Sequence, residues 1–274
     1  MIIVTGVGGF IGSNLAECLL KNSFEVVGVD ILDDYYDLNI KIKNLKLLKK
    51  YKNFKFLKKD AGLLDKKIIN NADIIYHEAG IGGVRYSVQN PKKYFKLNLE
   101  TTFNLLYNCL GSNIKKIVIA SSSSVYGNYP ESELPLKETY KCNPIAPYGC
   151  SKLAVENYCM NFFNVYKLPT ICLRYFTVYG PKQRPDEAIC KFVTKIFNNE
   201  EIEIYGDGKQ TRDFTYIKDV VNGTILSGES KFKGEIFNIG SGRKTSVLEL
   251  LKILEKETQS KMKLRFSERI TEDV

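Results

Sequence analysis

Short runs of β-branched and other apolar residues alternate along much of the chain with longer stretches in which apolar and polar residues are mixed. Apolar runs of about four to eight residues predict buried strands, and the longer stretches predict amphipathic helices. The predicted strands of this first pattern cover residues 2–5, 25–30, 54–57, 74–76, 117–120 and 169–173. Helices are predicted between these strands: the first ends near Lys21, and two others cover residues 91–110 and 147–166. This alternation indicates an α/β fold, a doubly wound parallel sheet of the Rossmann type.

The pattern changes after Arg174, where glycine and proline residues punctuate residues 179–185. Beyond this loop we expect helices near 187–198, 217–227 and 246–257, and strands at 202–205 and 235–239. These elements predict a smaller C-terminal α/β lobe that closes over the strand ends, where ligands bind in such sheets. We expect residues 1–176 to form the Rossmann domain and 177–274 mostly the lobe, with part of 213–239 returning to the first domain.

Composition narrows the class of protein. With 274 residues and 44% hydrophobic content, the chain can bury a large core together with a smaller one. Its seven cysteines are scattered without a C-x-x-C pair, which indicates reduced thiols in the cytoplasm and argues against a disulfide framework or a zinc site. The single histidine, His77, argues against a histidine-based triad and a metal site. No apolar run approaches the length of a membrane span, so we expect no membrane partner.

The net charge of +9 comes mainly from lysines, many of them within residues 41–67. We interpret this segment as a solvated surface, and we expect no nucleic-acid partner because no recognised binding module accompanies the charge. A positive field also favours an anionic substrate such as a nucleotide sugar.

The clearest chemical signal near the N-terminus is the spacing of Gly6, Gly9 and Gly12, which follow the first predicted strand. Such glycines allow a tight turn and a close approach of backbone to a pyrophosphate, which then faces the N-terminus of the next helix. Asp30 ends the second predicted strand, and a carboxylate there accepts hydrogen bonds from the adenosine ribose and repels a 2′-phosphate. We therefore predict NAD as the cofactor. Asp60, after the third predicted strand, is a candidate contact for the adenine.

A second signal is the pair Tyr148 and Lys152, which lie four residues apart and therefore on one face of a helix. A lysine cation beside a phenol is expected to lower the tyrosine pKa toward neutrality, so that the tyrosine exchanges a proton with a sugar hydroxyl. Two other tyrosines have the same spacing to a lysine, but only Tyr148 follows an apolar strand that ends in a run of serines, residues 121–124.

Together these motifs resemble those of the extended short-chain dehydrogenases/reductases and, within them, the NAD-dependent nucleotide-sugar epimerases. The resemblance is carried by residues 5–12, 30, 121–127, 148–152, 174–176 and 206–214. Three further stretches, residues 34–37, 83–87 and 177–186, resemble the UDP-glucuronate 4-epimerase branch.

The resemblance implies a role for each matching residue. Tyr148 would be the general acid/base, Lys152 would tune it and hold the nicotinamide ribose, and Ser122 would bond the sugar 4-oxygen. The implied cofactor site consists of Gly6, Gly9, Phe10, Ile11, Gly12, Asp30, Asp60, Asn98, Tyr148 and Lys152. The implied substrate side consists of Ser123, Ser124, Arg85, Thr177, Arg184 and Arg212.

Some of these roles are more specific than others. Arg184 would hold a sugar C6 carboxylate bidentately, and Thr177 points weakly to the same substrate. Arg212 would meet the diphosphate, whereas Arg85 fits a structural role as well as a substrate role. The chain also departs from the family pattern, because Glu78 stands where an apolar residue is usual.

The implied reaction is NAD-dependent epimerisation at C4 of a UDP-sugar through a 4-keto intermediate, with UDP-glucuronate and UDP-galacturonate as the expected pair. A UDP-glucose or UDP-N-acetylglucosamine 4-epimerase would use the same machinery and stays open. A 4,6-dehydratase is disfavoured because Ser123 and Ser124 supply no carboxylate, and a non-catalytic NAD-binding sensor because Tyr148 and Lys152 are both present.

Two expectations concern the whole chain. Apolar stripes on the predicted helices 91–110 and 147–166 cover the sheet or face another subunit, and the family resemblance favours a homodimer. The chain ends at Val274, before a further lobe segment that the family pattern includes, so a truncation is expected.

Overall fold

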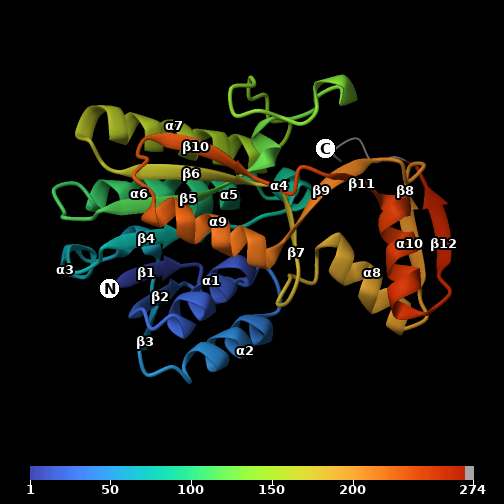
Figure 1. Cartoon of the computed structure of the whole chain (residues 1–274), viewed down its shortest axis with the longest axis horizontal. Helices are drawn as coiled ribbons and strands as arrows, with labels where there is room; N and C mark the ends of the chain where they lie inside the picture. Colours follow the sequence, from blue (N-terminus) through green and yellow to red (C-terminus); the bar gives the residue numbers. More distant parts are fainter. Residues whose placement is uncertain (269–274) are drawn as a thin grey trace.

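The main sheet of the protein is parallel throughout and carries its helices on both faces (Figure 1). The computed structural model describes residues 1–268, and within them this sheet has seven strands in the order β10-β6-β5-β4-β1-β2-β3. Its strands are β1 (Ile2–Thr5), β2 (Val26–Asp30), β3 (Phe54–Lys58), β4 (Ile74–His77), β5 (Lys116–Ser122), β6 (Thr170–Tyr175) and β10 (Glu235–Ile239). The predicted doubly wound α/β fold is confirmed.

The helices that flank this sheet bury its two faces. They are α1 (Phe10–Lys21), α2 (Leu38–Leu48), α3 (Lys66–Asn70), α4 (Val84–Gln89), α5 (Pro91–Tyr94), α6 (Thr101–Asn108), α7 (Pro147–Tyr166) and α9 (Ile217–Glu229). Neighbouring strand side chains point to opposite faces, so Ile2 and Val4 pack with the α1 and α9 side while Ile3 packs with the α6 and α7 side. Burial on both faces explains the near-continuous apolar runs of these strands.

The second part of the chain forms a lobe beside the main sheet, at the right of Figure 1. Its elements are β7 (Thr177–Tyr179), α8 (Ala188–Phe197), β8 (Glu201–Tyr205), β9 (Thr211–Tyr216), β11 (Lys244–Ser246), α10 (Val247–Thr258) and β12 (Lys263–Ser267). Strand β12 pairs with β8, and α8 and α10 cover this pair with a small core around Ile202 and Leu251. Helix α9 and strand β10, in contrast, lie on the main sheet.

Several local expectations differ from the structure. The helix expected over 91–110 is divided into α5, a π-helical turn over Phe95–Glu100, and α6. Asn98 lies in this turn and exchanges two hydrogen bonds with the backbone of Ile81, at 2.8 and 3.0 Å. Such π-turns occur frequently at functional sites.

The lysine-rich segment that we interpreted as a solvated surface contains a helix, α2, which the sequence analysis did not predict. Asp37 caps it by accepting a hydrogen bond from Asn39 N, and Leu45 and Leu48 anchor it to the core. Lys41 is also buried, and its Nζ donates to the carbonyl of Asp33 at 2.6 Å.

Two further points concern the chain as a whole. Among residues 1–268, no helix is both long enough and apolar enough to cross a membrane. The expected truncation near Val274 lies outside the described residues.

Candidate active site

The loops that follow β1, β2, β4 and β5 meet at one edge of the main sheet, because the carboxyl ends of parallel strands share an edge. Strand order reverses between β1 and β4, since the chain continues outward from β1 to β2 and β3 but returns on the other side with β4. Ligands of doubly wound sheets bind at such a switch point. The structure thus brings the glycine loop, Asp30 and the serine run to this edge.

Gly6 and Gly12 occupy positions that leave no room for a side chain. Gly6 has a φ of +64°, and a Cβ atom there would lie 2.8 Å from the carbonyl oxygen of Glu78. A Cβ on Gly12 would lie 2.3 Å from the carbonyl oxygen of Gly6, so α1 approaches β1 as closely as its backbone allows. Gly9 occupies the N-cap of α1 and has no side chain to cover the first turn, which begins at Phe10 and Ile11. These residues therefore fit the pyrophosphate of a dinucleotide.

Asp30 holds the glycine loop against the end of β2. Its Oδ2 accepts a hydrogen bond from Gly8 N at 2.9 Å, and its Oδ1 accepts one from Leu32 N at 2.7 Å. Each carboxylate oxygen retains a further lone pair, which fits hydroxyls of an adenosine ribose. Asp60, after β3, accepts from Gly62 N at 2.8 Å and from the Thr101 hydroxyl at 3.3 Å.

Three predicted catalytic residues meet where β5 ends and α7 begins. Pro147 opens α7, so Tyr148 lies in its first turn and Lys152 one turn later. Lys152 is 7% exposed, and its Nζ donates to the carbonyl of Ala120 on β5 at 2.8 Å. Ser122, at the end of β5, lies near enough to the phenol of Tyr148 to act on its pKa. A base, a cation and a hydroxyl donor thus surround one point of the site.

The protonation of Tyr148 differs from the sequence-based expectation. Burial raises the pKa of Tyr148, while Ser122 and the positive charge of Arg184 act in the opposite direction. Burial also lowers the pKa of Lys152, whose ammonium group is bonded to the Ala120 carbonyl. The prediction that Lys152 brings the tyrosine pKa down to neutrality is therefore wrong for the chain by itself, because desolvation outweighs the favourable charges.

The predicted cofactor residue Asn98 orders the segment beside Lys152. Besides its two bonds to Ile81, its Nδ2 donates to the Ser151 hydroxyl at 3.1 Å. A Cβ atom on Gly80 would lie 3.0 Å from Asn98 Oδ1 and 3.4 Å from Lys152 Nζ, so only a glycine backbone fits between them. Asn98 therefore fixes the backbone that faces Lys152.

The predicted substrate residues surround the same edge. Ser123 and Ser124 form a short 3₁₀ turn after β5, and Ser122 Oγ accepts from Ser124 N at 3.2 Å. Thr177 begins β7 and is half-buried, opposite Phe214 of β9. Arg212 is also half-buried on β9, where its Nη1 donates to the Thr211 carbonyl at 2.8 Å.

Arg184 already has carboxylate partners. Its Nε and Nη2 bond the two oxygens of Asp186 at 3.0 and 3.1 Å, and Nη2 also lies 2.5 Å from Glu187 Oε1. Its guanidinium lies 5.4 Å from the ring centroid of Tyr35. The C6-carboxylate role of Arg184 stays a prediction, and the structure adds that its charge is balanced by two acids.

Arg85 makes a contact between the main domain and the lobe. It projects from α4, and its guanidinium lies 4.6 Å from the ring centroid of Tyr205 on β8. This cation–π contact fits the structural role that the sequence left open beside the substrate role.

Sequence reasoning missed two aromatic residues that shape the site. Tyr94 packs edge-on against Tyr148, with ring centroids 6.0 Å apart, and its hydroxyl contacts the carbonyl oxygens of Gly82 and Gly83. Tyr35 donates to Asp186 Oδ2 at 3.0 Å. Only Tyr35 carried a signal, because it lies in the stretch 34–37 that matched the family.

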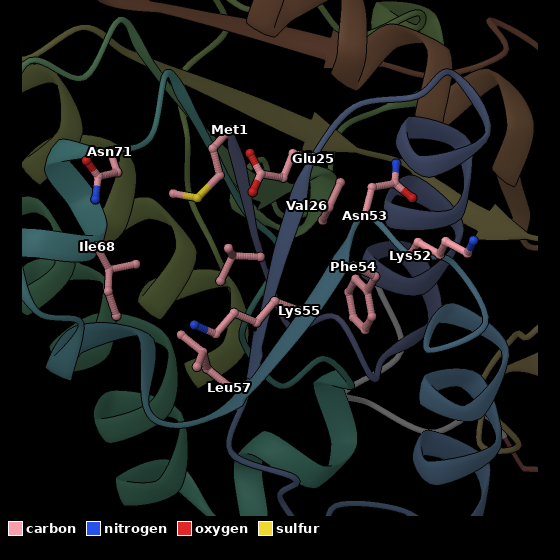
Figure 2. A pocket seen from close by; sticks show the side chains of 11 residues that line it. Met1, Glu25, Val26, Lys52, Asn53, Phe54, Lys55, Leu57, Ile68 and Asn71 are labelled. Carbon is pink, nitrogen blue, oxygen red and sulfur yellow. The ribbon is translucent and has the colours of Figure 1, made fainter.

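A shallow pocket at the other end of the sheet is a separate feature (Figure 2). The pocket is lined by the residue that immediately precedes each of three strands: Met1 before β1, Glu25 before β2 and Asn53 before β3. It therefore lies at the amino ends of the strands, away from Tyr148. Within residues 1–268, no cluster of acidic, histidine or cysteine side chains could hold a metal ion.

Comparisons with known proteins agree with this geometry. Residues 2–240 match the model of the NAD dependent epimerase/dehydratase family. The chain is 40% identical over 271 residues to the UDP-glucuronate 4-epimerase of Thermodesulfobacterium geofontis, covering 96% of this chain and 82% of that protein. The crystal structure of UDP-glucuronic acid 4-epimerase from Bacillus cereus with UDP-glucuronic acid and NAD has a TM-score of 0.93 at 37% identity, covering 98% of this chain and 86% of that one.

A third similar protein acts on a different sugar. The UDP-N-acetylglucosamine 4-epimerase of Methanobrevibacter ruminantium has a TM-score of 0.92 at 33% identity, and the match covers 100% of this chain and 86% of that one. These matches confirm the resemblance read from the motifs and the prediction of NAD as the cofactor.

Proposed function

The chain belongs to the NAD dependent epimerase/dehydratase family, and from this premise we propose that it interconverts UDP-glucuronate and UDP-galacturonate by epimerisation at C4. The observation that carries the proposal is the meeting of Tyr148, Lys152 and Ser122 beside the glycine loop. The choice of sugar is supported by the similarity to enzymes described as UDP-glucuronate 4-epimerases.

The residues of the chain perform the proton chemistry. Tyr148 takes the proton of the sugar C4 hydroxyl as the C4 carbon is oxidised, and it returns the proton when the 4-keto sugar is reduced on its other face. Ser122 would bond the sugar 4-oxygen beside the phenol, and the positive charge of Lys152, one helical turn from Tyr148, would favour the phenolate. NAD, when bound, supplies the hydride acceptor and donor at C4. The proton and the hydride both return, so the sum is an isomerisation.

Residues of the proposed NAD site have separate tasks. Gly6, Gly9 and Gly12, with Phe10 and Ile11, would hold the pyrophosphate at the start of α1. Asp30 would bind the adenosine ribose and Asp60 the adenine, while Asn98 and Lys152 would lie on the nicotinamide side.

The proposed substrate side combines hydroxyl and cationic groups. Ser123 and Ser124 would face the sugar, Arg212 would meet the diphosphate, and Thr177 and Arg184 would lie near C6. The positive charge of Arg184 also lowers the pKa of Tyr148, which gives it a role for any sugar substrate.

The proposed reaction is tested by NMR of the sugar anomeric protons. The purified chain is incubated with NAD and, separately, UDP-glucuronate, UDP-glucose or UDP-N-acetylglucosamine. A galacturonate signal from UDP-glucuronate is expected. Turnover of only a neutral sugar would keep the mechanism and replace the proposed substrate, whereas a 4-keto-6-deoxy product would indicate a dehydratase.

The variant Tyr148→Phe separates an enzyme from a non-catalytic NAD sensor. It keeps the ring contact with Tyr94 but removes the hydroxyl, so we expect a loss of about 10²–10⁴-fold in kcat with little change in NAD affinity. Tyr158→Phe is the matched control, because Tyr158 is 41% exposed on the same helix. Wild-type turnover in Tyr148→Phe would refute the assigned role.

The proposal includes a homodimer in the cytoplasm. Helix α7 exposes Tyr158, Val165 and Tyr166, and α6 exposes Tyr107, which together offer an apolar surface for a second copy. All seven cysteines, which lie in the described part of the chain, are free, and this fits a reducing compartment. Sedimentation equilibrium tests the assembly: Val165→Glu should yield monomers, and a wild-type chain that is monomeric would contradict it.

A further inference from the structure

Glu78 is a carboxyl group inside the site that the reaction proposed above does not use. It follows β4, and its side chain reaches Tyr175 of β6, whose hydroxyl lies 2.9 Å from Glu78 Oε1. The same hydroxyl lies 2.9 Å from the Thr224 hydroxyl of α9, which in turn donates to the Val220 carbonyl at 2.7 Å. Three hydrogen-bond contacts therefore follow one another from Glu78 into α9.

Counting hydrogens along this chain of contacts decides the protonation of Glu78. If Glu78 is ionised, Tyr175 and Thr224 supply only two hydrogens for three contacts, and one contact is left without a bond. If Glu78 is protonated, it donates to Tyr175, Tyr175 donates to Thr224, and Thr224 donates to Val220, so every contact is satisfied. The geometry thus fits the neutral acid.

The second carboxyl oxygen supports the same conclusion. Oε2 is fully buried and has no hydrogen-bond partner among the residues that the structure describes. An unpaired carbonyl oxygen costs far less to bury than an unpaired carboxylate oxygen. Burial accordingly raises the pKa of Glu78 to about 7, against the hydrogen bond from Tyr175 and the positive charge of Lys152.

The groups around Glu78 place it behind the proposed pyrophosphate loop. Its backbone lies against Gly6, as the 2.8 Å approach to a Cβ there shows. The titratable groups that face it are Lys152 of α7, Tyr175 of β6 and Tyr76 of β4. The neighbouring His77 is neutral, because burial lowers its pKa to about 3. Lys152 is thus the cation that acts on Glu78.

We propose that Glu78 is a positioning residue whose neutral form holds the end of β4 to β6 and α9, and whose ionisation weakens NAD binding at the adjacent glycine loop. An ionised Glu78 breaks the complete hydrogen-bond chain and places a negative charge behind a loop that receives an anionic pyrophosphate. By linkage, NAD binding favours the protonated acid, so affinity is highest below the Glu78 transition and falls as pH rises through it. The inference rests on the NAD site proposed above.

The test measures NAD dissociation constants by titration calorimetry from pH 6 to pH 9. A shift of one pKa unit in Glu78 on binding gives an affinity about tenfold weaker at pH 9 than at pH 6 in the wild type. Glu78→Gln keeps the shape and a hydrogen-bond donor without a charge, so its affinity should lack this decline. The control Glu229→Gln removes an exposed carboxylate of α9 and should behave as the wild type. The same decline in Glu78→Gln would overturn the proposal.

A second measurement does not depend on NAD. Infrared spectra of the chain alone should show a protonated carboxylic acid band near pH 6 that disappears as pH rises and is missing in Glu78→Gln. A wild type without such a band overturns the proposal. NAD that fails to bind at any pH would instead refute the proposed cofactor site, while the infrared titration still decides the state of Glu78.

Discussion

A buried ion pair behind the serine run offers a stringent test of the structure. Arg174 on β6 donates from Nε and Nη2 to the two oxygens of Glu156 on α7, at 2.9 and 2.8 Å. The two side chains are only 4% and 1% exposed. The Ser121 hydroxyl donates to Glu156 Oε1 at 2.5 Å, so the pair lies next to the residue that precedes Ser122. We predict that Glu156→Ala strongly destabilises the protein.

The magnitude follows from what the substitution leaves behind. Arg174 retains a contact with the Tyr126 ring and a bond to the Glu138 carbonyl, but its charge loses the carboxylate that balances it. Breaking a buried pair by removing one partner costs about 3–5 kcal/mol. Since each kcal/mol shifts Tm by about 2–4 °C in a chain of this size, we expect Tm to fall by about 10 °C.

The assay is thermal and urea unfolding followed by circular dichroism. Lys209→Ala serves as the control, because both side chains of the Lys209–Asp207 ion pair are exposed. This substitution should change the free energy of unfolding by less than about 1 kcal/mol. The double variant Glu156→Leu/Arg174→Met removes both charges and should recover most of the loss. If Glu156→Ala costs no more than Lys209→Ala, the buried network does not exist as described.

Two further predictions concern the site itself. Gly12→Ala places a Cβ 2.3 Å from the Gly6 carbonyl oxygen, so it should lower the free energy of unfolding in urea by about 1–3 kcal/mol and weaken NAD binding. The control Gly223→Ala meets only the Ile239 side chain, at 3.1 Å, and should do neither. Equal effects of the two variants would contradict the close helix–strand contact. Arg184→Ala removes the guanidinium proposed to hold the C6 carboxylate, so turnover of UDP-glucuronate should fall far more than turnover of a neutral UDP-sugar in the NMR assay, and an equal loss on both would refute that role.

The sequence determined the features that depend on neighbouring residues. Valine- and isoleucine-rich runs predicted β1, β2, β4, β5 and β6 within a few residues of their bounds, because a strand buried on both faces must be apolar along its length. Glycine spacing predicted a tight loop at Gly6, and the four-residue spacing of Tyr148 and Lys152 predicted their common helix face. Each of these inferences needs only the period of a strand, a turn or a helix.

The tertiary structure decided what depends on distant residues. Strands β7 and β11 have only three residues each, and β9 and β12 mix charged with apolar residues, so their sequences gave little signal before the strands paired in the lobe. The helix expected over 91–110 is interrupted by the π-helical turn over Phe95–Glu100, in which Asn98 bonds Ile81, 17 residues away. The pKa of Tyr148 is raised because burial by the fold outweighs the opposing effects of Ser122 and Arg184. Glu78 was visible in the sequence only as a departure from a family pattern, and its protonation became decidable once β6 and α9 were placed against it. Burial and hydrogen-bond partners set the chemistry of a side chain, and both are properties of the folded chain as a whole.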